Sequence, residues 1–231
     1  MTQKCILILD YSVTKFETAA IKQWLPSDGQ VLSLFVDTEE SFPDDLIRRD
    51  ISHVIHSGSE HSILDEQPFT KKAVSYIQAV RDKGIPQMGI CFGHQLLCLA
   101  LVGRHAVQAS PKGLEAGWNE VKFTNNAMNM FGIKEKETIW QHHFDEVISL
   151  PAGSELLATN AHSRIQAFIN REQNLFGTQF HPEIDLTTGN KFYQRGRKLL
   201  EKNNYDVKKL MQGSPSIDAG NIFFQFFLGQ A

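Results

Sequence analysis

The sequence predicts an α/β fold, with a central, mostly parallel sheet flanked by helices and an additional small antiparallel sheet. Two patterns predict it. Through the first hundred residues, short apolar runs alternate with helix-like segments, which is typical of a parallel sheet covered on both faces. From Val121 onward, short strand-like runs follow one another with only turns between them, which favours antiparallel strands and hairpins. No repeat, low-complexity tract or linker interrupts the chain, so we expect residues 1–231 to form a single domain.

The first half of the chain is expected to alternate between strands and helices. An unbroken apolar run near the N-terminus indicates a first strand in the core, and the later segments follow the same logic. We expect strands at residues 5–9, 31–36, 53–57 and 86–90, and helices at residues 16–25, 44–49, 70–83 and 94–101.

The second half is expected to begin with short strands and to end with helices. The polar, lysine-rich residues 187–213 have a helical pattern and predict either a solvated helix pair or a lid or docking surface near the active site. The phenylalanines of residues 223–227 indicate a buried face of a closing helix. The short strands are expected at residues 121–123, 138–141, 147–150, 156–159, 165–169 and 175–180.

Composition excludes several classes of protein. The 42% apolar and 21% charged content is ordinary for a globular domain. The net charge of −3 gives no electrostatic reason to expect nucleic acid. No apolar run approaches the roughly 20 residues of a membrane span, and the N-terminal run is too short for a signal peptide. We therefore expect no nucleic-acid or membrane partner.

The cysteines point to a reducing compartment. Cys5, Cys91 and Cys98 are odd in number and widely spaced, which argues against a disulfide framework. We expect the protein in the cytoplasm. Cys98 is expected in the core rather than as a redox partner of Cys91.

One cysteine lies in a pattern that favours nucleophilic catalysis. Cys91 stands between Gly89 and Gly93, where the strand expected at 86–90 turns into the helix expected at 94–101. Gly-x-Cys-x-Gly is the cysteine counterpart of the Gly-x-Ser-x-Gly nucleophile elbow, a strained turn that needs glycine neighbours. A helix N-terminus beside the sulfur favours thiolate over thiol.

A base and its orienting carboxylate are expected much further along the chain. His181 ends the strand predicted at 175–180, and Glu183 follows two positions later. Residues two apart in an extended chain point to the same side, so Glu183 can hold the imidazole tautomer of His181. With Cys91, these residues supply a nucleophile, a base and an orienter for acyl transfer.

An oxyanion hole is expected from two backbone N–H groups. The N–H of Phe92 directly follows the nucleophile and would point to the developing oxyanion. The second donor is expected in another loop at the same sheet edge, where the strand predicted at 53–57 runs into Gly58.

Metal and cofactor chemistry finds little support. The chain has no Cys-x-x-Cys, His-Glu-x-x-His or P-loop pattern. The best histidine pairs are His56 with His61 and His142 with His143. Neighbouring strand residues point to opposite faces, so His142 and His143 are poorly placed to chelate one ion. We expect no metal and no cofactor.

Taken together, these segments resemble the class I, or triad-type, glutamine amidotransferases. The resemblance rests on residues 89–95 with residues 179–183, and the single-domain group around the amidotransferase domain of GMP synthase is the most similar. Residues 113–118, 140–147 and 221–227 resemble three further segments of that family. The resemblance implies a flavodoxin-like sheet and covers most of the chain.

The resemblance also implies roles for individual residues. Cys91 would be the nucleophile, His181 the base and Glu183 the orienter, with Gly58 and Phe92 as the oxyanion hole. Gln95 and the backbone around His142, His143 and Phe144 are implied to help hold the α-amino and α-carboxylate groups of glutamine.

Two departures from the family pattern leave the substrate open. Residues 57–59 read Ser-Gly-Ser, where the family often has Gly-Gly-Pro, and Phe144 stands where it often has glycine. Both features also resemble the γ-glutamyl peptidases of plants. The expected substrate is therefore glutamine or another γ-glutamyl compound. If the substrate is glutamine, the ammonia would go to a separate synthase subunit, since this chain has no synthase or ATP-binding portion. A non-catalytic binding protein on the same scaffold is the third alternative.

Overall fold

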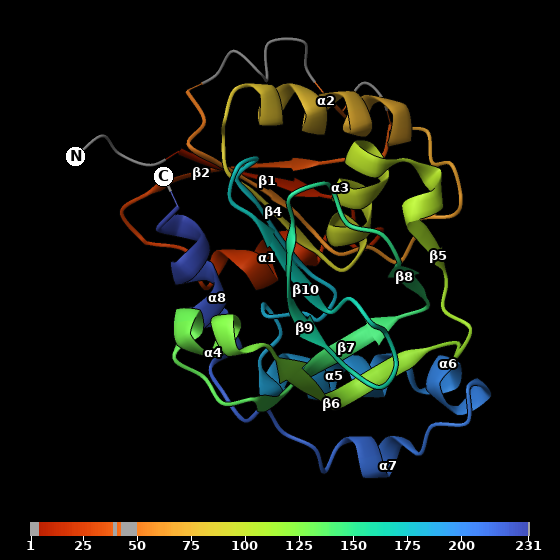
Figure 1. The fold of residues 1–231 in the computed structure, drawn as a ribbon. Helices are drawn as coiled ribbons and strands as arrows, with labels where there is room; N and C mark the ends of the chain where they lie inside the picture. The colour runs from red at the N-terminus through yellow and green to blue at the C-terminus, as the bar shows by residue number, and fades with distance from the viewer. Residues whose placement is uncertain (1–4, 39–40, 43–49, 231) are drawn as a thin grey trace.

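The computed structural model describes residues 5–38, 41–42 and 50–230, and its elements are drawn in Figure 1. The strands are β1 (Cys5–Asp10), β2 (Gln30–Phe35), β3 (His53–His56), β4 (Gln87–Ile90), β5 (Val107–Ala109), β6 (Glu115–Phe123), β7 (Lys136–His143), β8 (Asp145–Val147), β9 (Glu155–Thr159), β10 (Ala167–Asn170) and β11 (Leu175–Thr178). The α-helices are α1 (Glu17–Lys22), α2 (Thr70–Asp82), α3 (Phe92–Val102), α4 (Asn125–Phe131), α5 (Leu186–Arg195), α6 (Arg197–Lys202), α7 (Val207–Leu210) and α8 (Ala219–Leu228), and η3 (Arg104–Ala106) is a 3-10 turn.

The main sheet has nine strands in the order β2-β1-β3-β4-β11-β10-β9-β6-β7. Its first five strands run parallel, and every later pair is antiparallel. The antiparallel strands expected from the sequence thus continue the parallel sheet, and β11 is parallel to β4 while it is antiparallel to β10. A separate two-stranded antiparallel sheet pairs β5 with β8. The predicted fold class is confirmed.

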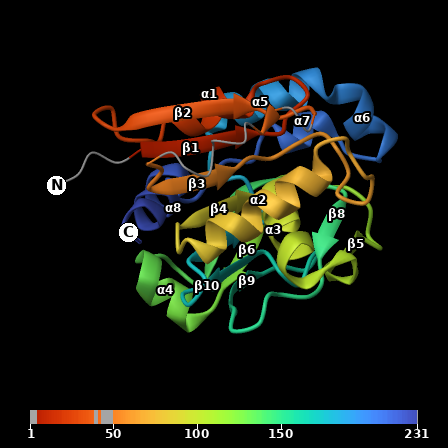
Figure 2. The ribbon, with the colours of Figure 1, turned by 90° about the horizontal axis from the view of Figure 1, so that it is seen from above.

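Helices cover both faces of the parallel half of the sheet (Figures 1 and 2). Strand β1 shows why both covers are needed, because its side chains alternate between faces and are all apolar up to Asp10. Leu7 and Leu9 pack in the cluster that contains α2 and α3, whereas Ile6 and Ile8 pack in the cluster that contains α8 and Ile21 of α1. The catalytic candidates at the carboxyl ends of the strands therefore stand on a rigid base.

The closing helix α8 buries an aromatic face, as the sequence predicts. Phe223, Phe224 and Phe227 are at most 1% exposed, and Phe226 packs half-buried against Phe131 at a ring distance of 4.9 Å. The helix begins at Asp218, whose side chain accepts a hydrogen bond from the backbone N–H of Asn221. This capping satisfies one of the unpaired donors at the helix start.

Residues 187–213 form three helices rather than a pair. Gly196 separates α5 from α6, and Asp206 caps the short α7 after a turn. Their buried side chains Tyr193, Leu200 and Val207 form a third core cluster with the outer strands β6 and β7. The segment is therefore part of the packed fold, and its polar residues form the outer surface.

Other local expectations fail where long-range pairing decides the structure. Strand β6 begins at Glu115, six residues before the expected start, because it pairs with β7 along eight residue positions. The strand expected at 147–150 is wrong: β8 ends at Val147, and Ile148 is 48% exposed. Helix α4 has no counterpart among the expected helices, although Thr124 caps its start. The helix expected at 44–49 lies outside the described residues.

Among the described residues, we find no helix that combines the length and the apolarity needed to cross a membrane.

Candidate active site

The expected nucleophile lies on a strained turn. Cys91 connects β4 to α3 and has φ 49° and ψ −103°, a region that non-glycine residues rarely adopt. Hydrogen bonds hold the turn on both sides: the N–H of Cys91 donates to the carbonyl of Thr178, and the carbonyl of Cys91 accepts from the N–H of Gln95. The sulfur is thereby presented at the N-terminus of an 11-residue helix.

Both glycines of the elbow are required by close backbone approach. A Cβ on Gly93 would overlap the carbonyl oxygen of His56, and one on Gly89 would lie 2.5 Å from the carbonyl oxygen of Gly93. The N–H of Gly93 also donates to the carbonyl of Ser57. The elbow is therefore packed directly against the end of β3, which brings the loop that contains Gly58 beside the nucleophile.

The expected base and orienter are joined by a short hydrogen bond. Nδ1 of His181 lies 2.5 Å from Oε1 of Glu183. His181 is 7% exposed and Glu183 is fully buried. Since Nδ1 faces the carboxylate, Nε2 is the nitrogen left for chemistry, and it has no hydrogen-bond partner in the described part of the chain.

The electrostatics of this pair favour a protonated imidazole. Burial alone lowers the pKa of His181, but the charge of Glu183 and then that of Cys91 raise it, and the pKa lies well above its usual range. A protonated imidazole beside a cysteine is an arrangement suited to nucleophilic catalysis.

The main chain of Glu183 is held by the end of the first helix. Nε1 of Trp24 donates to the carbonyl oxygen of Glu183 at 3.0 Å, and Nε2 of Gln23 donates to the same oxygen at 3.1 Å. Trp24 is itself fixed, because a Cβ on Gly220 at the start of α8 would overlap its indole ring. The end of α1 and the start of α8 thus help to fix the main chain of Glu183, the expected orienter.

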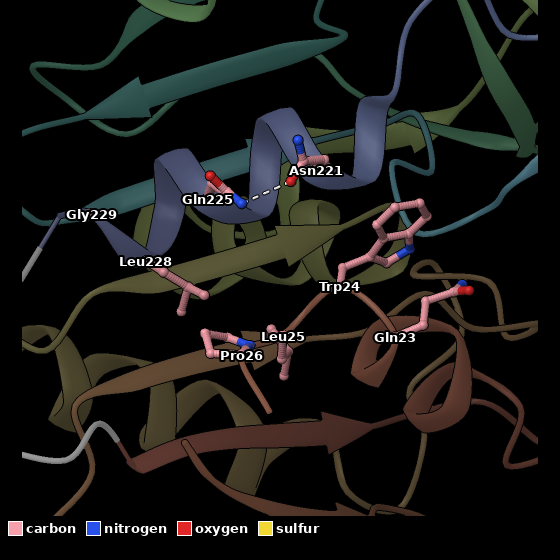
Figure 3. A pocket seen from close by; sticks show the side chains of 8 residues that line it. All are labelled: Gln23, Trp24, Leu25, Pro26, Asn221, Gln225, Leu228 and Gly229. Carbon is pink, nitrogen blue, oxygen red and sulfur yellow. Dashed lines mark hydrogen bonds between the residues drawn. The ribbon is translucent and has the colours of Figure 1, made fainter. Parts of the chain in front are cut away.

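A hollow of about 510 Å³ opens beside these two donors, and its lining is shown in Figure 3. Its lining contains none of the site residues expected from the sequence. The geometry of Cys91, rather than this volume, therefore marks the reacting centre. The hollow is lined by Gln23, Trp24, Leu25, Pro26, Asn221, Gln225, Leu228 and Gly229.

Both expected oxyanion donors lie beside the triad candidates. Phe92 is the first residue of α3, and Gly58 lies so close to His181 that a Cβ on it would be 3.1 Å from Cε1 of the imidazole. Within the described residues, the backbone N–H of neither residue donates to another group of the protein. Two unclaimed N–H groups next to a nucleophile are what an oxyanion hole requires.

Gln95 is directed into the protein rather than toward the sulfur. It is 3% exposed, and its Nε2 donates to the carbonyl oxygen of Asp145 at 2.8 Å and to Oε1 of Gln179 at 3.1 Å. Gln179 in turn points its Nε2 at Sγ of Cys91, 3.6 Å away. Gln95 therefore holds Gln179, and Gln179 offers a weak donor to the sulfur.

His142 and His143 face opposite sides of β7, as expected for strand neighbours. The carbonyl oxygen of His142 lies 3.8 Å from Sγ of Cys91. Burial and then the positive charge of His181 lower the pKa of the His142 imidazole to about 4, so that it is neutral at pH 7. Phe144 follows with 42% of its surface exposed.

His143 faces a buried polar network behind the site. Its Nε2 lies 2.9 Å from Oε2 of Glu115, and its Nδ1 lies 3.0 Å from the carbonyl oxygen of Asp145. Burial is the largest single influence and raises the pKa of Glu115, but the hydrogen bonds from His143 and Asn119 and the charges of His143 and His162 together lower it. Both nitrogens of His143 are thus directed away from Cys91, and the network supports the chain on both sides of Phe144.

A second glutamate lies beside the His181–Glu183 pair. Glu17, in the first turn of α1, is 6% exposed, and its carboxyl oxygen lies within 4.8 Å of donor atoms of both His181 and Glu183. Nothing in the sequence separates Glu17 from other glutamates. Gln179 could have been found, because it stands two residues before His181 and so points to the same side.

Among the described residues, two groups of side chains have donor atoms close enough for a metal ion: Glu115 with His143 and His162, and Glu17 with His181 and Glu183. In the first group, Glu115 already accepts from Asn160 at 2.6 Å in addition to its contact with His143. In the second, Nδ1 of His181 is committed to Glu183. We assign a metal to neither.

The remaining histidine and cysteine candidates have structural roles. His56 is fully buried between the hydroxyl of Tyr11 and Oε1 of Gln87, each 3.0 Å away, so both of its nitrogens are occupied. His61 packs its ring near Phe69. Cys98 is fully buried in the core, where burial raises the pKa of its thiol, and neither Cys91 nor Cys98 forms a disulfide.

The chain can be assigned to a known protein family. Residues 37–198 match the family described as Glutamine amidotransferase class-I. The chain belongs to the class I glutamine amidotransferase family. The resemblance inferred from the sequence motifs is thereby confirmed.

Similar proteins within this amidotransferase family differ in length. A glutamine-hydrolyzing GMP synthase subunit of Sulfurisphaera tokodaii is 33% identical over 141 residues, which are 61% of this chain and 72% of that protein. The glutamine-hydrolyzing GMP synthase of Clostridium novyi is 33% identical over 145 residues, which are 62% of this chain and only 27% of that longer protein.

Solved structures show the same fold. A glutamine amidotransferase from Thermotoga maritima superimposes with a TM-score of 0.81, at 19% identity, over 100% of this chain and 99% of that one. A putative GMP synthase subunit from Thermoplasma acidophilum gives a TM-score of 0.67, at 22% identity, over 100% and 94% of the two chains.

The elbow geometry makes a direct prediction for this amidotransferase. Gly93→Ala should lower the alkylation rate of Cys91 by iodoacetamide about tenfold or more, because the new Cβ must push α3 away from His56 and misplace the sulfur. Peptide mass spectrometry can locate and quantify the alkylated cysteine in folded protein.

Gly229→Ala is the matched control, since a Cβ there meets only ordinary contacts at 3.4 and 3.5 Å. Equal alkylation rates in the two variants would contradict the packing of the elbow described above.

Proposed function

We propose that the protein hydrolyses the γ-glutamyl amide of glutamine through a thioester on Cys91, with His181 and Glu183 completing a Cys-His-Glu triad. One observation carries the proposal: Cys91, at a positive φ after β4, and the His181–Glu183 pair, just after the parallel neighbour β11, lie at the same edge of the sheet and interact electrostatically. The raised pKa of His181, to which the charge of Cys91 contributes, supports an imidazolium–thiolate pair as the resting state.

In the first half of the reaction, the Cys91 thiolate attacks the γ-carbonyl carbon of the substrate. The carbonyl oxygen becomes an oxyanion, which the unclaimed N–H groups of Gly58 and Phe92 would stabilise. The protonated Nε2 of His181 then donates its proton to the departing amine. For glutamine the products of this half-reaction are ammonia and a γ-glutamyl thioester.

In the second half, water hydrolyses the thioester. His181, now neutral, accepts a proton from the water as it attacks the thioester carbonyl. Collapse of the tetrahedral intermediate releases glutamate and restores the Cys91 thiolate. Glu183 remains ionised throughout and keeps Nδ1 of His181 as the donor, so that Nε2 is the nitrogen that gains and loses the proton.

The residues around this centre suggest how the glutamyl group is held. The neutral His142 imidazole and the exposed Phe144 ring are candidates for direct substrate contacts. Gln95 and His143 contribute from behind: both contact the carbonyl oxygen of Asp145 and so support the segment that follows Phe144.

A separate synthase subunit is the proposed recipient of the ammonia. The shorter relatives support this, because each is described as one subunit of a glutamine-hydrolyzing GMP synthase. This chain matches only 27% of the longer Clostridium novyi protein. We infer that the synthase portion of that protein lies in the unmatched part and that its counterpart here is a separate subunit.

A γ-glutamyl peptidase is the second candidate function. Phe144 favours it, because a large, 42% exposed ring directly after His143 could contact a leaving group larger than ammonia. In that case an amino acid or conjugate, rather than ammonia, would take the proton from His181, and no partner subunit would be needed.

Glutamate release from two substrates tests the function. Purified protein incubated with glutamine or with γ-glutamyl dipeptides should release glutamate, and Cys91→Ala should reduce the rate at least about 10³-fold, because the nucleophile is lost. A higher kcat/KM for glutamine supports the amidotransferase activity, and a higher value for dipeptides supports the peptidase.

Cys98→Ala is the matched control, since Cys98 lies on the same helix but in the core. Release that survives Cys91→Ala would refute the assigned nucleophile. If glutamate is released from neither substrate, even in the presence of the synthase partner, the proposed enzymatic function is wrong.

A further inference from the structure

Two buried carboxyl oxygens next to His181 lack a partner. Oε2 of Glu17 and Oε2 of Glu183 are buried and accept no hydrogen bond within the described part of the chain. The carboxyls belong to residues that are 6% and 0% exposed. Donor atoms of Glu17, His181 and Glu183 all lie within 4.8 Å of one another. Two ionised carboxylates placed in this way would repel each other without hydration, which is a costly arrangement.

We propose that Glu17 is a neutral carboxylic acid that donates its proton in a hydrogen bond to Glu183 and so fixes the orienting carboxylate of the triad. Glu17 is then a positioning residue, because it acts through Glu183 and touches no reacting atom. The proposal rests on the triad of the proposed function, and it adds a fourth member from a distant part of the chain.

The charges around Glu17 agree with a neutral state. Burial is the largest influence and raises the pKa of Glu17 well above its usual range; the charge of Glu183 raises it further. His181 opposes this, while Asp10 and Glu60 add to it. A protonated His181 can neutralise one carboxylate, and its 2.5 Å bond pairs it with Glu183. No positive charge of His181 is then left to stabilise an ionised Glu17.

The first helix is built to hold Glu183 at two points. Glu17 lies in the first turn of α1, and Gln23 and Trp24 follow its last turn and donate to the main-chain carbonyl of Glu183. The same helix therefore reaches both the backbone and the side-chain region of Glu183. A Cβ on Gly58 would lie 3.0 Å from Oε1 of Glu17, so Gly58 also leaves room for this carboxyl.

Kinetics in two backgrounds separate this role from simple packing. Glu17→Gln keeps the shape and a neutral donor, so kcat should stay within about threefold of the parent. Glu183→Gln should lower kcat about 10²-fold, because the imidazole loses its carboxylate. In that background Glu17 no longer faces a like charge and can ionise to serve His181 in part. The double variant should therefore lose about tenfold more.

One outcome of these kcat measurements would contradict the proposal. If Glu17→Gln changes kcat by the same factor with Glu183 present and with Glu183 replaced, Glu17 only fills space and the proposal is wrong. Glu137→Gln serves as the matched control, since Glu137 is also buried but bonds to Lys134 and Ser216. It should leave kcat unchanged in both backgrounds.

A second measurement needs no turnover. Because Glu17 is protonated when folded but loses its proton at about pH 4.3 when unfolded, its contribution to stability is lost as pH rises from that value toward the folded pKa. Glu17→Gln cannot ionise. The melting temperature of Glu17→Gln minus that of the parent should therefore increase by about 3 °C for each pH unit across this window.

Scanning calorimetry from about pH 5 to about pH 8 gives this difference directly. A difference that does not change with pH would show that Glu17 is ionised in the folded protein and would overturn the proposal. Because the stability result does not depend on γ-glutamyl hydrolysis, failure of the proposed function and failure of the Glu17 proposal are distinguishable.

Discussion

The active site depends on how closely the start of α3 approaches the end of β3. Only a glycine at position 93 allows this approach, because any Cβ would overlap the carbonyl oxygen of His56. In this arrangement Cys91 has a positive φ, its sulfur lies at a helix N-terminus, and the N–H of Gly93 bonds to Ser57, next to Gly58. The proposed roles of Cys91 as nucleophile and of Gly58 and Phe92 as oxyanion donors depend on this close approach, and the apolar packing of β1, β3 and β4 between helices maintains it.

The base is positioned by a different part of the fold. His181 is fixed by Glu183, and the main chain of Glu183 is fixed by Gln23 and Trp24 at the end of α1. Trp24 packs against Gly220 of α8, so the C-terminal helix contributes to the site without touching it. Elements from the beginning and the end of the chain thus help to place His181, the proposed base.

The sequence could predict the parts of the site that local rules control. Glycines around Cys91 and the two-residue spacing from His181 to Glu183 have direct geometric meaning, and the structure brings these residues together. Local patterns predict only the last part of strand β6, because its full length depends on long-range pairing with β7. Local patterns also cannot single out Glu17, because only the long-range fold places this helical glutamate in a buried position beside Glu183. Gln95 is expected at the substrate, but its amide bonds to Asp145 and Gln179.

The central claim is that Cys91 becomes acylated by a γ-glutamyl group. The reaction with glutamine, and separately with a γ-glutamyl dipeptide, can be quenched in acid within its first turnover and digested for mass spectrometry. The peptide that contains Cys91 should gain the mass of one γ-glutamyl group, and the same mass should appear with either substrate, because the thioester does not depend on the leaving group. Glutamate release without this adduct, or an adduct on Cys5 or Cys98 instead, would contradict the claim.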